Sequence, residues 1–68
     1  SMLTFKYETT REASESAYRW LTVFNNGEEW VSFRLDQTST ETEQRVITAI
    51  ENQNEAAVYA LWSPVNTN

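Results

Sequence analysis

The chain contains no cysteine and no histidine among its 68 residues. A disulfide framework is therefore excluded, and a zinc, haem or iron–sulfur centre would lack its usual thiolate and imidazole ligands. The same absences remove the best nucleophile and the usual general base of enzymes. We therefore expect a protein that is not an enzyme and carries no cofactor or metal. The lack of cysteine also suits a reducing compartment, which favours a cytoplasmic location.

Glycine and proline are nearly missing as well, since Gly27 and Pro64 are the only ones. A glycine-rich loop that could cradle phosphates is thus excluded. No apolar run approaches the roughly 20 residues that span a bilayer, and the N-terminus lacks the basic and apolar regions of a signal peptide. The sequence predicts a soluble protein.

Charge of one sign predominates, because ten acidic residues stand against five basic ones and give a net charge of −5. This charge repels nucleic-acid phosphates at long range, so non-specific binding to DNA or RNA is disfavoured. No acidic residues follow the spacing of a calcium loop. The simplest role of the dispersed carboxylates is solubility.

The small size of the chain limits its organisation to one domain, near the lower end of what a single core can stabilise. We interpret Ser1 as a remnant of tag removal, which makes Met2 the natural start of a complete small reading frame. Residues 64–68 are expected to form a frayed tail.

Two alternating apolar runs flank Asn26-Gly27, the strongest short-range signal for a β-hairpin. A type I′ turn at these residues fixes the pairing of the two strands, because residues directly opposite share a face. The expected pairs after Asn25/Glu28 are Phe24/Glu29, Val23/Trp30, Thr22/Val31, Leu21/Ser32, Trp20/Phe33, Arg19/Arg34 and Tyr18/Leu35.

This register predicts two faces of different character. The expected core face carries Tyr18, Trp20, Thr22, Phe24, Val31, Phe33 and Leu35. The other, which we call the hairpin face, carries an apolar cluster flanked by two arginines: Leu21, Val23 and Trp30, with Arg19 and Arg34, and Ser32 beside them. The hairpin face is the candidate binding site of the sequence.

Three interpretations of the hairpin face compete. Another part of the chain covers it, with Trp30 in the core; or a partner covers it, either a larger protein or a second copy; or Trp30 stacks on a base of single-stranded nucleic acid while Arg19 and Arg34 contact phosphates. We favour the partner, since tryptophan and arginine dominate interface energies. Trp30→Ala is then expected to abolish partner capture and to leave the fold intact.

The functional hypothesis is a non-enzymatic regulator or inhibitor that docks on a larger protein, of phage or mobile-element origin. A homo-oligomeric structural protein is the alternative. Single-stranded nucleic-acid binding is less favoured, because the chain is acidic.

Outside the hairpin, residues 2–9 alternate apolar and polar side chains, the pattern of a half-buried strand. Residues 10–17 are small and polar and suit either a connecting loop or a single helical turn capped by Thr10, and we expect the loop. Apolar residues recur at helical spacing within 37–53, which predicts a helix. Its N-cap is either Thr38 or Thr40, each of which begins a capping box.

The end of the predicted helix and the segment after it are less determined. Either Asn52 or Asn54 could adopt the left-handed conformation that ends a helix. Residues 55–63 suit a helix by their alanines and a strand by their aromatic and β-branched residues. We favour a strand, because the preceding helix needs a sheet to cover and a fourth strand widens that sheet. Pro64 ends this segment in either case.

Together these patterns predict an α+β fold in a single domain of residues 1–68. Its small antiparallel sheet follows the order β-β-β-α-β around the central hairpin, and one helix packs on one face.

Overall fold

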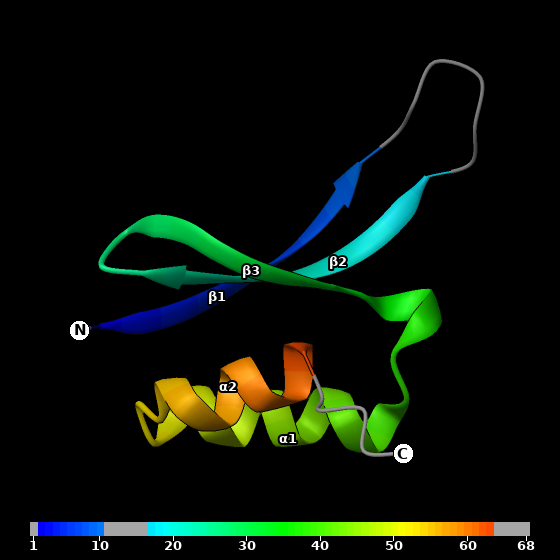
Figure 1. The fold of residues 1–68 in the computed structure, drawn as a ribbon. Coiled ribbons are helices and arrows are strands. Elements are labelled where there is room, and N and C mark those ends of the chain that lie inside the picture. The colour runs from blue at the N-terminus through cyan, green and yellow to red at the C-terminus, as the bar shows by residue number, and fades with distance from the viewer. Residues whose placement is uncertain (1, 11–16, 64–68) are drawn as a thin grey trace.

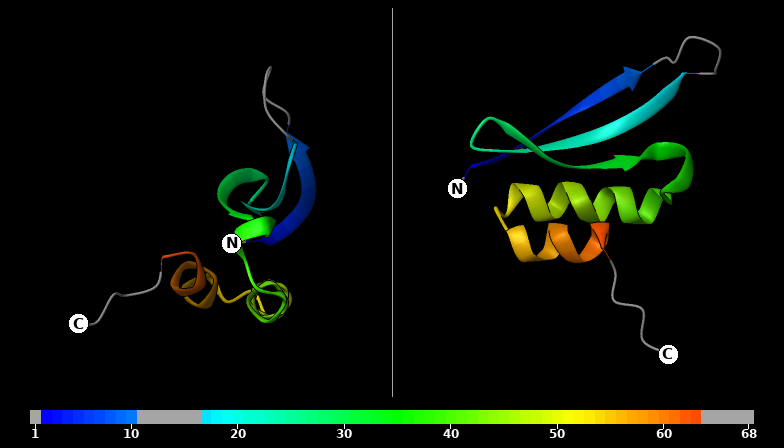
Figure 2. Two further views of the ribbon diagram at one scale, coloured as in Figure 1. Left: turned by 90° about the vertical axis from the view of Figure 1, so that its right-hand side faces the viewer. Right: turned by 45° about the horizontal axis from the view of Figure 1, so that its top comes forward.

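Three antiparallel strands and two α-helices make up the fold of residues 2–10 and 17–63, the part of the chain that the computed structural model describes. In chain order the elements are β1 (Leu3–Thr10), β2 (Tyr18–Asn25), β3 (Glu28–Arg34), the 3-10 helix η1 (Leu35–Gln37), α1 (Thr40–Glu51) and α2 (Glu55–Trp62). The strands lie in the order β1-β2-β3, and both helices lie along the same side of the sheet (Figures 1 and 2). The predicted α+β class is confirmed.

Parts of three predictions fall outside the described residues. These are the tag remnant at Ser1, residues 11–16 of the expected loop, and the expected tail at 64–68 with Pro64.

The Asn26-Gly27 turn is confirmed. Asn26 has φ 56° and Gly27 has φ 85°, the pair of positive values that a type I′ turn requires. Asn25 faces Glu28 as predicted. The turn also anchors the first strand, because the Asn26 amide donates to the Met2 carbonyl at 2.8 Å and the Asn26 Oδ1 accepts from the Met2 amide at 2.8 Å.

A β-bulge next to this turn overturns the rest of the predicted register. Phe24 still faces Glu29, but the next residue of β2, Val23, faces Val31. Trp30 is therefore an extra residue on β3 without a partner on β2. Every predicted pair beyond Phe24/Glu29 is wrong by one residue, and β3 ends at Arg34, so that Leu35 belongs to η1.

The bulge changes which side chains form the core. Leu21 now faces Phe33 and Val23 faces Val31, and all four are buried on the side of the helices. A one-residue shift moves a side chain to the opposite face of a sheet. The core thus combines β2 residues of the predicted hairpin face with β3 residues of the predicted core face. Its buried members are Leu3, Leu21, Val23, Val31, Phe33, Val46, Ala49, Ile50 and Val58.

Helix α1 begins at a cap that lies between the two predicted ones. The Ser39 hydroxyl accepts a hydrogen bond from the Thr42 amide at 3.0 Å. Thr38 is not the cap, because its hydroxyl donates to the carbonyl of Arg34 at 2.8 Å, and Thr40 is the first helical residue.

The end of α1 is a Schellman motif in which neither predicted asparagine has the left-handed conformation. Gln53 has φ 53°. The backbone amide of Gln53 donates to the Ile50 carbonyl, and the backbone amide of Asn54 donates to the Ala49 carbonyl, both at 2.9 Å. Gln53 therefore reverses the chain, and Asn54 is free to begin the next element.

The last apolar segment is a helix, which corrects the predicted fourth strand and the order β-β-β-α-β to β-β-β-α-α. The Asn54 side chain caps α2 by accepting from the Ala57 amide at 3.1 Å. Alanine-rich sequence and a capping asparagine favour the helix over the strand. α2 lies beside α1 and contacts β3, and its Val58 is fully buried in the core.

Candidate functional site

The hairpin face does not exist as an exposed surface. Leu21 and Val23 are 0 % exposed, so neither is accessible to a partner in this fold. Trp30 is half-buried and packs against the core. Of the three interpretations of this face, coverage by the chain's own helices is the one that the packing shows for Leu21 and Val23, and the predicted site is corrected for these two residues.

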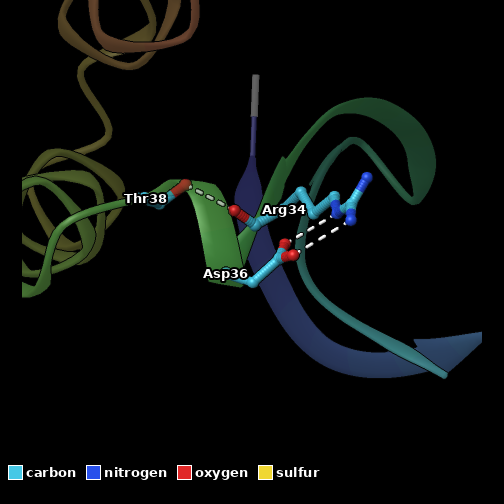
Figure 3. A network of polar contacts seen from close by, with 3 residues as sticks. All are labelled: Arg34, Asp36 and Thr38. Carbon is cyan, nitrogen blue, oxygen red and sulfur yellow. Dashed lines mark hydrogen bonds and ion pairs between the residues drawn. The ribbon is translucent and has the colours of Figure 1, made fainter. Parts of the chain in front are cut away.

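The two arginines of the predicted site do not face each other. Arg34 lies opposite Trp20, and its guanidinium forms two hydrogen bonds with Asp36, from Nε at 2.6 Å and from Nη2 at 2.9 Å (Figure 3). Its charge centre lies 3.6 Å from the centre of the Tyr18 ring. The hydrogen bond to Asp36 raises the pKa of Arg34, so the guanidinium stays protonated, and its positive charge is compensated by the Asp36 carboxylate.

The other basic side chains of the described residues are also engaged and lie apart from one another. Arg19 lies 5.8 Å from the ring centre of Tyr7, Lys6 lies 5.4 Å from that of Phe24, and Arg45 contacts the Glu41 carboxylate at 2.7 Å. Such dispersed cations do not form the continuous basic stripe that tracks a nucleic-acid backbone.

The surface that stands out belongs to α2. Seven of its eight residues are apolar, yet only Val58 is buried. Tyr59 is 51 % exposed and Trp62 is 45 % exposed, and their rings pack with centres 5.7 Å apart. A helix that is apolar on all sides is normally covered on all sides. We call the exposed residues Ala56, Tyr59, Ala60 and Trp62 the α2 surface.

Among the described residues, no strand pairs with the outer edge of β3, which lies beside the α2 surface. β3 is an outer strand of the sheet, and the Thr38 hydroxyl donates to the Arg34 carbonyl on the side away from β2 (Figure 3). Backbone groups alternate in direction along a strand, so those of Ser32 point the same way as those of Arg34. We call the Ser32 amide and carbonyl and the Arg34 amide the β3 edge.

A hollow of about 420 Å³ joins the β3 edge to the end of α2. Its lining combines residues of β3, apolar residues of β2 and α2, and polar residues of η1 and the start of α1: Ser32, Phe33 and Arg34; Trp20, Leu61 and Trp62; and Gln37, Thr38, Ser39 and Thr42. The hollow thus brings exposed backbone, apolar side chains and hydroxyl and amide side chains to one place. This combination fits a polypeptide better than a small charged ligand.

The opposite edge of the sheet is partly closed by a side chain. The Gln53 amide group accepts from the Leu3 backbone amide at 2.7 Å and donates to the Leu3 carbonyl at 2.9 Å. The side chain therefore imitates a neighbouring strand at the start of β1. Such protection is one way in which proteins blunt an exposed edge.

A second hollow, of about 560 Å³, lies between the two helices. Small side chains, Ala49, Ala57 and Ala60, form much of its lining, and the exposed ion pair of Glu41 and Arg45 lies at its rim. Its lining holds no exposed aromatic side chain to act as an anchor, so we place the candidate site at the α2 surface and the β3 edge.

Within residues 2–10 and 17–63, no three carboxylates come together in a way that could hold a metal ion. No helix in these ranges has the length and apolar character needed to cross a membrane. Comparisons with protein-family models, curated proteins and solved structures found no match to this chain. The site must therefore be interpreted from its own geometry.

Proposed function

We propose that this protein is a non-enzymatic regulator that docks on a larger protein through the α2 surface. The observation that carries the proposal is the mismatch between composition and burial in α2, where Tyr59 and Trp62 remain about half exposed although nearly the whole helix is apolar. Contiguous exposed apolar residues of this kind are typical of interaction sites.

The two aromatic side chains can supply much of the binding energy. Tyrosine and tryptophan bury about 150–250 Å² each. Covering the exposed half of both would contribute roughly 5 kcal/mol at about 25 cal/mol per Å², before the cost of association is subtracted. These residue types are also the most frequent interface hot spots.

The partner should present an apolar patch with basic residues at its border. Glu55 begins α2, and Glu28 and Glu29 are exposed at the start of β3, while the whole chain carries a net charge of −5. Electrostatic complementarity of this kind mainly raises the association rate and the specificity. We place the activity in the cytoplasm, where a chain without cysteine is suited to the reducing conditions, and we propose a phage or mobile element as its source.

A captured and then purified partner tests the proposal directly. Affinity capture from the host lysate identifies the protein, and the dissociation constant is then measured with the purified pair. Trp62→Ala should weaken binding at least tenfold, and Tyr7→Ala, which removes an equally exposed aromatic outside the α2 surface, should leave it unchanged. Equal affinity of wild type and Trp62→Ala, with both proteins folded by circular dichroism, would refute the proposal.

Self-association through the β3 edge is the second candidate function. β3 is an outer strand of the sheet, so the β3 edges of two copies could pair antiparallel about a twofold axis and form one continuous sheet. Sedimentation velocity over a wide range of concentrations separates the two candidates, because a constant monomeric mass removes the second one.

A further inference from the structure

We infer that the partner supplies an extended segment that joins the β3 edge as a fourth strand of the sheet. This inference rests on the proposed function and names the form of the partner. Addition of a strand to an exposed edge is a recurring mode of peptide recognition, in which backbone hydrogen bonds give affinity and alternate side chains give specificity.

The first step of the argument is the direction of the backbone groups. The Asn26 backbone amide donates to the Met2 carbonyl. The backbone amide and carbonyl groups of even-numbered β2 residues therefore point toward β1, and those of odd-numbered β2 residues point toward β3. The β3 partners of odd-numbered residues, Val31 and Phe33, thus bond to β2. Ser32 consequently directs both of its backbone groups away from the sheet, in agreement with the contact between Thr38 and Arg34.

The second step is the position of α2 beneath this edge. The main contact of α2 with the sheet is to β3, and the main contact of α1 with the sheet is to β1. Figure 2 shows α2 on the β3 side of α1. An added strand would therefore lie above a helix that already presents Leu61 and Trp62 to the hollow.

The third step fixes the side chains of the segment. Ser32 faces Thr22 and belongs to the face of the sheet opposite the helices, so a residue paired with Ser32 would also point away from them. Its two neighbours in the segment would point toward Leu61 and Trp62. The segment should therefore carry two apolar residues separated by one residue of any type.

The fourth step fixes the direction and the charge. In an antiparallel arrangement, the C-terminal end of the added segment approaches the N-terminal end of β3, where Glu28 and Glu29 are exposed. The carboxylate of Asp36 already neutralises Arg34 at the other end. A lysine or arginine shortly after the second apolar residue would complement the two glutamates.

A displayed library of random decapeptides, selected on the wild-type protein, tests the inference. Enriched peptides should contain the apolar–any–apolar pattern followed by a basic residue. Their affinities are then measured on two edge variants. Ser32→Pro removes the outward amide of β3. Thr9→Pro makes the matched change on β1, where the odd-numbered residues are the ones whose backbone groups point outward. Trp62→Ala removes the apolar wall of the hollow and keeps the edge intact.

The expected result is a loss of at least tenfold in affinity with Ser32→Pro and with Trp62→Ala, and no change with Thr9→Pro, each variant being folded by circular dichroism. Peptides that lose affinity with Trp62→Ala and keep it with Ser32→Pro would overturn strand addition and leave the proposed function standing. Peptides sensitive to neither variant, or no enriched peptide, would overturn the inference, and a Ser32-dependent dimer in sedimentation would replace the partner segment by a second copy.

Discussion

At the scale of single residues, Gln53 shows how one side chain can connect two ends of a small fold. Its positive φ ends α1, and its amide group bonds to the backbone of Leu3, fifty positions earlier in the chain. The side chain also donates to the Ile50 carbonyl at 2.9 Å. A glutamine in the left-handed conformation is disfavoured on its own, and these hydrogen bonds offset that cost.

We predict that Gln53→Ala lowers the free energy of unfolding by about 1–2 kcal/mol, because partly buried groups of Leu3 lose their partner. Urea denaturation measures the change. Gln53→Gly is the informative comparison, since glycine loses the same hydrogen bonds but relieves the left-handed conformation by about 1 kcal/mol. If Gln53→Ala is as stable as wild type, the amide group does not hold β1 to the end of α1.

Tyr7 provides a pH-dependent test of the contact between β1 and α1. Its hydroxyl donates to Glu43 at 2.7 Å, and this hydrogen bond is the main cause that raises the pKa of the Tyr7 phenol above its usual value. The folded protein thus holds the phenolic proton more tightly than the unfolded chain does. The stabilisation is complete below the ordinary tyrosine pKa of about 10 and is lost as the pH rises through the higher folded value.

We therefore expect Tyr7→Phe to be less stable than wild type by at most about 1 kcal/mol near neutral pH, since the pair is exposed, and the difference should vanish in strong alkali. Thermal unfolding from about pH 8 to about pH 11 follows this difference. Tyr59→Phe is the matched control for loss of an exposed hydroxyl. A gap between wild type and Tyr7→Phe that grows with pH would have the wrong sign for this contact.

At the scale of elements, the β-bulge at Trp30 decides which residues the hairpin buries. The turn could be predicted from Asn26-Gly27 because its positive φ values have a direct residue preference. The bulge has no comparable signal, since alternating apolar residues on β3 fit either register. The predicted hairpin face therefore placed Leu21 and Val23 on the wrong side, although it identified them as members of one apolar cluster.

Because Trp30 packs against the core, we predict that Trp30→Ala lowers the free energy of unfolding by about 2 kcal/mol, less than for a fully buried tryptophan. The sequence alone led to the opposite expectation, an intact fold with lost partner capture. Chemical denaturation of Trp30→Ala distinguishes a destabilised fold from an intact one. Trp62→Ala, on the α2 surface, should cost less, and an equal or greater cost there would contradict the assignment of Trp62 to binding.

The two helices differ in how far the sequence could predict them. α1 has helical spacing, glutamates in its first turn and hydroxyl residues at its start, so its existence was predicted. Only its N-cap, Ser39, and the left-handed residue after its C-cap, Gln53, differ from the prediction. α2 has too little amphipathic pattern to separate helix from strand. The one local signal was Asn54 followed by alanines, and its N-cap role depends on Gln53 reversing the chain just before it.

At the scale of the whole molecule, one sheet face is covered by helices and the helix layer itself is only partly covered. A chain of 68 residues has few segments with which to do more. Because of this incomplete coverage, the α2 surface was not identified as the candidate site from the sequence. Tyr59 and Trp62 look like core residues in a strand, and they become a surface only because α2 buries little beyond Val58.

The most direct measurement is an NMR titration of the isotope-labelled protein with its purified partner, with every backbone amide and the tryptophan indoles observed at once. Docking at the α2 surface predicts that the signals of Tyr59 and Trp62 shift most, with Ser32 shifting as well if a strand is added. Shifts confined to the far side of the sheet, around Lys6 and Phe24, would contradict the account and place the interface on the face without helices.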